Sequence, residues 1–207
     1  MGATAEVRWF YPGDVPEAVS TWFEALPGDR TEERRTDRYL RPTDAALNLK
    51  WREGQLEIKR RDAEGEHAEI TESVAGRLER WRKWSFDATE RTSTESAYWI
   101  DVAKTRWKRR YRVEAGGRVT AYAGTDRLED GCDVEVTILS VQGEPWWSVC
   151  LEAFGDEASL QGTLMHTAQH VFRIAAPPAL EEAHSKGYAA WLLESVEPAA
   201  LSVRPES

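Results

Sequence analysis

Residues 98–113 read YWIDVAKTRWKRRYRV, a length and composition that predict one long β-strand. Side chains on a strand alternate between its two faces. One face of 104–112 therefore carries five Lys or Arg in a row, whereas the opposite face carries Trp107 and Tyr111. Like charges side by side repel each other. Such a row needs anions beside it, supplied either by acidic neighbours or by a polyanionic ligand.

The segments around this strand show the same split between a charged and an apolar face. Alternation predicts further strands at residues 4–11, 37–41, 46–52, 55–61, 118–124, 132–141 and 146–154. Lys50 shares a face with Arg52, opposite Leu49 and Trp51. In the same way Lys59 shares a face with Arg61, Asp133 shares one with Glu135, and Glu6 shares one with Arg8. Five strands with this split indicate a common charged face.

Helical spacing of apolar residues predicts helices at residues 14–26, 71–84, 156–173 and 186–195. The charged stretches 30–36 and 62–70 are predicted to be loops. Each helix needs an apolar surface to cover, and the apolar strand faces supply one. The pattern predicts an α+β fold, built on an antiparallel barrel with its polar face inward and its apolar face outward under helices. Most small barrels have the opposite arrangement, with an apolar interior.

A length of 207 residues favours one domain, which we place at residues 1–195, followed by a C-terminal tail at 196–207. The competing interpretation is a half-buried sheet with a solvated polar face. That interpretation predicts that Lys50, Lys59 and Lys104 are freely exposed.

Composition limits the classes of partner. The chain has 27 Lys and Arg against 36 Asp and Glu, a formal net charge of −9, which argues against coating DNA or a membrane. No run approaches 18 apolar residues, and the first residues lack a signal pattern, so a cytoplasmic location is expected. Cys132 and Cys150 are expected to be buried, reduced thiols. A small polyanion held inside a cationic tunnel remains compatible with the net charge.

The Lys, Arg and carboxylate side chains on the inward strand faces indicate which ligand the barrel would bind. Guanidinium and ammonium groups bind phosphate oxygens, and clustered carboxylates hold a hard divalent cation such as Mg²⁺ or Mn²⁺. Both together suit a linear polyphosphate, whose terminal phosphorus is then open to in-line attack by water.

The chain resembles the CYTH, or triphosphate tunnel metalloenzyme, superfamily. Thr4-Ala5-Glu6-Val7-Arg8 is similar to the Glu-x-Glu-x-Lys motif of its first strand, with Thr4 in place of the first glutamate. LNLKWREGQLEIKRR at 47–61 and VAKTRWKRRYRV at 102–113 resemble its phosphate-binding strands. Asp133-Val134-Glu135 is similar to its late carboxylate strand, and Ser185-Lys186-Gly187-Tyr188 with Trp191-Leu192-Leu193 is similar to its closing signature.

This resemblance implies an eight-stranded tunnel that binds and hydrolyses a small triphosphate with Mg²⁺ or Mn²⁺. The implied phosphate-binding residues are Lys50, Arg52, Lys59, Arg61, Lys104, Arg106, Lys108 and Arg110. The implied metal ligands are Glu6, Asp133, Glu135 and Glu152, and the implied catalytic residues are Glu6, Arg8 and Glu135. Thr4 cannot supply the negative charge of a carboxylate. A non-catalytic binder of a phosphorylated ligand or an RNA end is therefore the alternative, and an adenylate cyclase is a weaker one.

Overall fold

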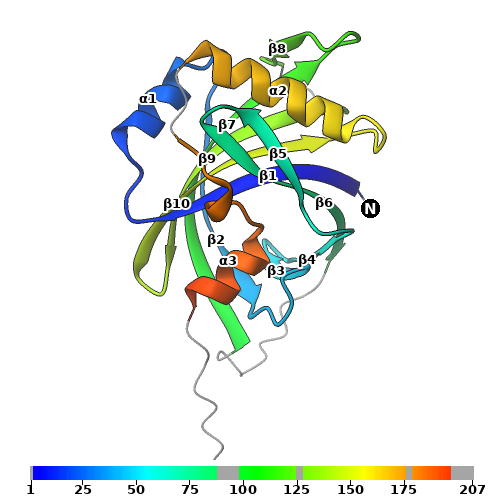
Figure 1. Cartoon of the computed structure of the whole chain (residues 1–207). Coiled ribbons are helices and arrows are strands. Elements are labelled where there is room, and N and C mark those ends of the chain that lie inside the picture. Colours follow the sequence, from blue (N-terminus) through cyan, green and yellow to red (C-terminus); the bar gives the residue numbers. More distant parts are fainter. Residues whose placement is uncertain (1, 88–97, 125–127, 176–178, 197–207) are drawn as a thin grey trace, which may run out of the picture.

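The computed structural model describes residues 2–87, 98–124, 128–175 and 179–196, and its centre is a closed antiparallel β-barrel (Figure 1). Eight strands close it, in the order β1 (Gly2–Pro12), β10 (Glu144–Phe154), β9 (Gly131–Val141), β7 (Trp99–Val113), β2 (Thr31–Leu40), β3 (Leu47–Arg52), β4 (Gln55–Arg61) and β6 (Val74–Asp87). Pairing of β6 with β1 completes the ring. Two further strands lie outside it: β5 (Glu66–Thr71) pairs with β6, and β8 (Val119–Ala121) pairs with β7.

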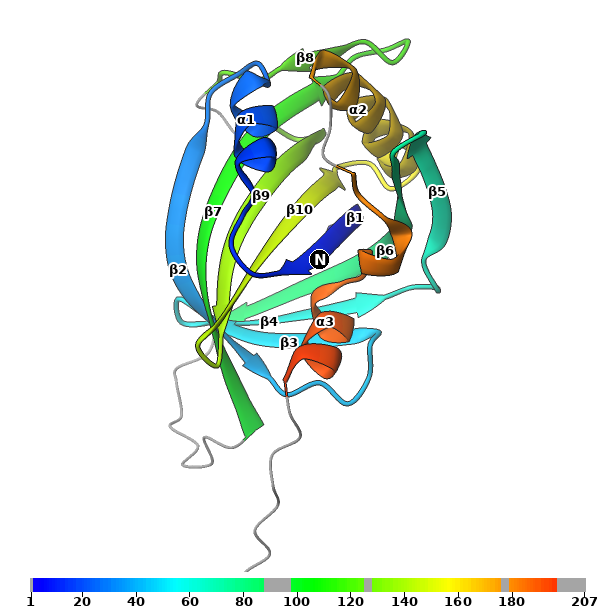
Figure 2. The ribbon, with the colours of Figure 1, turned by 60° about the vertical axis from the view of Figure 1, so that its left-hand side comes forward.

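Three α-helices flank this barrel, so the predicted α+β class is confirmed. They are α1 (Glu17–Ala25), α2 (Leu160–Ile174) and α3 (Tyr188–Ser195), and a 3₁₀ turn at Glu182–His184 precedes α3. Figure 2 shows α1 and α2 near one end of the barrel and α3 near the other. In the described part of the chain, no helix has both the length and the apolar character needed to cross a membrane.

The larger hydrophobic core lies outside the barrel, as the parity of the strands predicts. Val7 and Trp9 of β1 point outward, and α1 and α2 pack over this side. Trp22 of α1 stacks on Phe172 of α2, with 5.2 Å between ring centroids. Burial of these apolar side chains outside the ring leaves the interior free for charged groups.

A second core closes one end of the barrel from within. Inward residues of β1, β2, β7 and β9 meet α3 there, and Trp191 of α3 stacks on Phe10 of β1 at 4.6 Å between centroids. Tyr188, at the start of α3, stacks on Tyr39 of β2. The interior is therefore a charged chamber with an aromatic floor.

Three sequence-based predictions of local structure were wrong. Residues 71–84, predicted as a helix, form most of β6, and the predicted loops at 62–70 and 30–36 contain β5 and the start of β2. Val74, Leu78 and Trp81 have helical spacing, but β6 pairs with β1, β4 and β5. Such long-range pairing overrides local spacing. Residues 88–97, Pro177-Pro178 and the tail from 197 lie outside the described residues.

Candidate functional site

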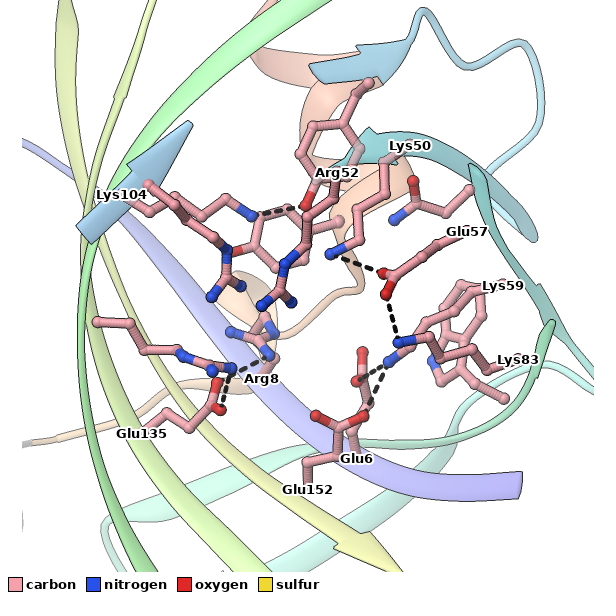
Figure 3. A pocket seen from close by; sticks show the side chains of 16 residues that line it. Glu6, Arg8, Lys50, Arg52, Glu57, Lys59, Lys83, Lys104, Glu135 and Glu152 are labelled. Carbon is pink, nitrogen blue, oxygen red and sulfur yellow. Dashed lines mark hydrogen bonds and ion pairs between the residues drawn. The ribbon is translucent and has the colours of Figure 1, made fainter. Parts of the chain in front are cut away.

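A pocket of about 120 Å³ lies inside the barrel, lined by inward side chains from its strands and by Tyr188 (Figure 3). Nine residues that the sequence singled out as site candidates line it: Glu6, Arg8, Lys50, Arg52, Lys59, Lys104, Arg106, Glu135 and Glu152. The remaining lining residues are Arg35, Tyr39, Asn48, Glu57, Trp81, Lys83 and Tyr188. Strand parity thus brings together residues that lie up to 146 positions apart in the sequence.

The lysines that test the competing interpretation are enclosed. The exposed fractions of the Lys50, Lys59 and Lys104 side chains are 16%, 22% and 2%. A solvated sheet face would leave all three open to bulk water, so that interpretation is wrong.

Four inward carboxylates lie in one register row across four neighbouring strands. Glu79 of β6 pairs with Glu6 of β1, Glu6 pairs with Glu152 of β10, and Glu152 pairs with Asp133 of β9. Each carboxylate in the row has a cationic partner. Arg61 bonds to Glu79, and burial together with the charge of Glu6 raises the pKa of Glu79.

Lys59 neutralises the centre of this row. Its Nζ lies 2.8 Å from Glu152 Oε1 and 3.4 Å from Glu6 Oε2. Burial alone would lower the pKa of Lys59, but the carboxylates of Glu152 and Glu6 outweigh it and raise that pKa. Burial would raise the pKa of Glu152, yet Lys59 holds it well below its usual range. Both groups are therefore charged at neutral pH.

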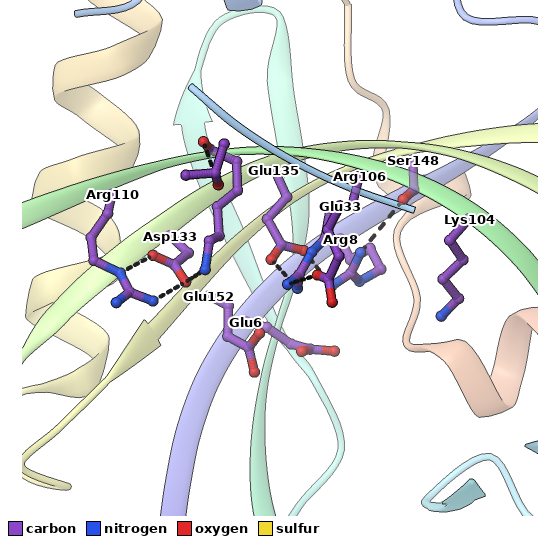
Figure 4. A network of polar contacts seen from close by, with 12 residues as sticks. Glu6, Arg8, Glu33, Lys104, Arg106, Arg110, Asp133, Glu135, Ser148 and Glu152 are labelled. Atoms are coloured by element: carbon purple, nitrogen blue, oxygen red, sulfur yellow. Dashed lines mark hydrogen bonds and ion pairs between the residues drawn. The ribbon is translucent and has the colours of Figure 1, made fainter. Parts of the chain in front are cut away.

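Arginines bind the carboxylates of β9 (Figure 4). Arg110 donates two hydrogen bonds to Asp133, at 2.6 and 2.8 Å, and Lys108 Nζ lies 3.2 Å from the same carboxylate. Glu135 accepts a 2.8 Å bond from Arg106 and lies 3.5 Å from Arg8.

The other side of the pocket centres on Asp37, which is fully buried. Its carboxylate contacts Lys104 Nζ at 2.9 Å, Lys50 Nζ at 3.2 Å and Arg35 Nε at 2.9 Å. Burial opposes ionisation, but Lys104 and Lys50 hold the pKa of Asp37 far below its usual value. Lys104 also donates a 2.6 Å bond to the hydroxyl of Tyr39. These contacts fix Lys104 at the floor.

Glu57 links this side to β6. It accepts a 2.7 Å bond from Lys83 and lies 3.1 Å from Lys50. Burial would raise the pKa of Glu57, but Lys50 and Lys83 lower it to about 2.

Cations outnumber carboxylates around the pocket. Among the described residues that line it, eight are Lys or Arg and four are Glu. Asp37 and Glu33 contact the same cations from beside the pocket, so the excess of positive charge is smaller but persists. This excess suits a ligand that carries several negative charges.

Some candidate residues do not reach this pocket. Arg61 is bonded to Glu79, and Asp133 is bonded to Arg110 and Lys108. Lys108 and Arg110 instead line a separate pocket, beside Thr31 and Tyr122.

The inward carboxylates offer few ligands for Mg²⁺ or Mn²⁺. In the described residues, no three His, Cys, Asp or Glu side chains are grouped in a way that could hold a metal ion. Glu6 and Glu152 do stand together at Lys59, and Mg²⁺ in phosphate sites often takes one or two carboxylates with substrate oxygens and water. Lys59 Nζ already contacts both carboxylates, so this pair fits such an ion only when the lysine turns away from it. Asp133 and Glu135 are instead occupied by arginines.

Thr4 lies inward on β1, two residues before Glu6. It faces Trp81 of β6 and Phe154 of β10 in the register. Its Oγ1 is buried and finds no hydrogen-bond partner among the described residues. A hydroxyl in this position adds no charge to the carboxylate row.

Sequence reasoning missed Arg35, Asp37 and Lys83 as site residues. Arg35 and Asp37 lie in β2, of which only the part from residue 37 was predicted as a strand. Lys83 lies in β6, most of which was predicted as a helix. A parity split of 31–40 would have placed Glu33, Arg35 and Asp37 on one face. The signal was present, but the charge density of this segment favoured a loop.

Comparison with known proteins assigns no family, since no protein-family model and no curated protein matches the chain.

Proposed function

We propose that this chain is a divergent member of the triphosphate tunnel metalloenzyme superfamily and a metal-dependent phosphohydrolase. Its substrate would be a small molecule that bears a triphosphate: inorganic triphosphate, a nucleoside triphosphate or thiamine triphosphate. The observation that carries the proposal is the convergence of Glu6, Lys59, Lys104 and Glu135 on one enclosed pocket with excess positive charge.

The cations of the pocket would bind the phosphate chain. Three cations line the cavity: Lys50, Arg52 and Arg106. Each has a carboxylate partner, but its side chain stays partly exposed. A phosphate oxygen can take the place of a carboxylate oxygen at such a group. Since the internal carboxylates already hold these cations in place, little reorganisation accompanies binding.

Glu6 and Glu152 would hold the metal ion once Lys59 turns from these carboxylates toward the phosphates. When bound, Mg²⁺ or Mn²⁺ would neutralise charge at phosphate oxygens and lower the pKa of a bound water. Glu135 orients Arg8 and Arg106 toward the cavity, where they would stabilise negative charge on the terminal phosphoryl group. Attack by water on the terminal phosphorus breaks its bond to the bridging oxygen and releases orthophosphate.

Thr4 supports a second candidate, a binder of phosphorylated ligands without turnover. Among the described residues of the carboxylate row, Glu6 and Glu152 stand together, whereas Thr4 brings no charge and Glu79 and the β9 carboxylates are bonded to arginines. A binder needs the cations but not the metal ion. Nucleotide cyclisation in the same chamber is a weaker candidate.

The test is phosphate release from tripolyphosphate, ATP and thiamine triphosphate, each with Mg²⁺, with Mn²⁺ and with EDTA. The hydrolase predicts release that requires the metal, and a loss of about 100-fold or more in kcat/KM for Glu152→Gln. Arg34→Ala is the matched control, since Arg34 lies on the outward face of β2 and is exposed. Unchanged turnover is expected there.

The same panel separates the candidates. Tight triphosphate binding by calorimetry in EDTA, without turnover under any metal, would select the binder. Cyclic nucleotide formed from ATP would select the cyclase. Neither binding nor turnover with any of the three triphosphates would refute a phosphate function for the pocket.

A further inference from the structure

The outward face of β3, β4 and β6 carries an apolar patch that neither hydrophobic core uses. Two register rows form it: Leu49, Ile58 and Trp84 in one, and Trp51, Leu56 and Phe86 in the next. All six are absent from both cores, including the partly buried residues packed against them. Phe86 is 51% exposed, and Leu47, beside the first row, is 38% exposed.

This face lies away from the packed side of the barrel. The helix α2 packs over β1, β5 and β7–β10, and the large outer core follows the same strands. Contiguous apolar patches rimmed by polar residues mark sites of protein association. Here the apolar residues lie on three adjacent strands, so they form a continuous surface.

The patch has charges of opposite sign at its two ends. Arg60 lies beside the first row, with 63% of its side chain exposed and Asp62 3.8 Å away. Arg82, next to Arg60 in the register, is bonded to Asp62 and Glu157. Glu53 lies two residues after Trp51 at the other end of the patch, in the turn after β3, with 72% of its side chain exposed and Arg52 Nε 3.5 Å away. The first end therefore offers the exposed cation of Arg60 and the other end the exposed anion of Glu53, each 3.5 Å or more from its partner in the same chain.

We propose that this face joins two copies of the chain in a symmetric dimer. The two-fold axis lies in the interface and crosses the strands at right angles. This rotation reverses the order of the rows, so the Arg60 end of one copy meets the Glu53 end of the other. An axis along the strands would instead place Arg60 against Arg60, and like charges in contact disfavour that arrangement. Such an isologous contact buries the same patch on both copies.

Charge reversal in two separate variants tests this geometry by sedimentation velocity. The wild-type chain is expected to dimerise. Arg60→Glu and Glu53→Arg should each weaken the dimer by about tenfold or more, since each places like charges together. An equimolar mixture of the two variants should recover the dimer, because both contacts in the mixed pair join opposite charges. Arg34→Glu, on the outward face of β2, should leave the dimer unchanged.

The mixture also guards against misfolding, since damaged chains would not recover a dimer when combined. A wild type that stays monomeric at about 100 µM would overturn the proposal, because that affinity is too weak for a stable dimer. So would single variants that dimerise like the wild type, or a mixture that stays monomeric. If deletion of residues 197–207 converts a monomeric wild type into a dimer, the tail covers the patch and the proposal is wrong.

Discussion

Lys59 of β4 and Glu152 of β10 meet inside the barrel with 2.8 Å between Nζ and Oε1, although β6 and β1 separate their strands in the sheet. The contact exists because the sheet closes and turns both side chains inward. It draws Glu152 and Glu6 to one cation, the ammonium group of Lys59.

Replacement of Lys59 by Met should lower the free energy of unfolding at pH 7 by about 3–5 kcal/mol, as expected when a buried pair loses one partner. Lys59 depresses the pKa of Glu152, so the pair stabilises the fold above the unfolded-state pKa of about 4.3 and loses this effect as pH falls through the folded-state value. Urea titrations at pH 7 and pH 3 measure both. Arg34→Met should change stability by under about 0.5 kcal/mol, and an equal loss for Lys59→Met at both pH values would contradict the electrostatic explanation.

Glu57 should contribute to the acid sensitivity of the fold. Its pKa of about 2 lies below the usual value, so its stabilisation is complete above about pH 4.3 and is lost as pH falls through 2. Glu57→Gln should therefore be less stable than the wild type by a few kcal/mol at pH 6, and the two should converge near pH 2. Chemical denaturation across this range checks the prediction. Glu129→Gln, an exposed change, should follow the wild-type curve throughout.

Thr4→Glu should strengthen metal binding at the carboxylate row. A third carboxylate beside Glu6 adds negative charge to a buried site, so the variant should melt below the wild type in EDTA. Mn²⁺ should then raise its melting temperature by more than it raises that of the wild type. Thr36→Glu, on the outward face of β2, is the control and should show no added response to Mn²⁺. A Thr4→Glu variant with the wild-type response would argue against a metal at this row.

The aromatic floor should depend on Trp191. This residue is buried and stacks on Phe10, so Trp191→Ala should lower the free energy of unfolding by about 3–5 kcal/mol. Leu193 lies on the same helix but is 43% exposed, and Leu193→Ala should have a much smaller effect. Denaturant titrations compare the two. Equal effects would mean that α3 is not anchored through Trp191.

Much of the barrel was predictable from side-chain alternation. The charged and apolar faces of 46–52, 55–61, 104–112 and 132–141 lie as parity requires, and both cysteines are buried and free. The error at β6 has a physical cause. Val74, Leu78 and Trp81 fit a helical stripe, but this segment completes the ring between β4 and β1, and closure demands an extended strand there.

The sequence alone determined which side chains share a strand face, because the two-residue period of a strand is local. It therefore placed Lys50 with Arg52 and Lys104 with Arg106. Only the tertiary structure decided which faces meet. Closure of the barrel brought Asp37 beneath Lys104 and set Lys59 between Glu6 and Glu152, while it directed Asp133 to Arg110. Strand order and register join residues far apart in the chain, and no local pattern encodes them.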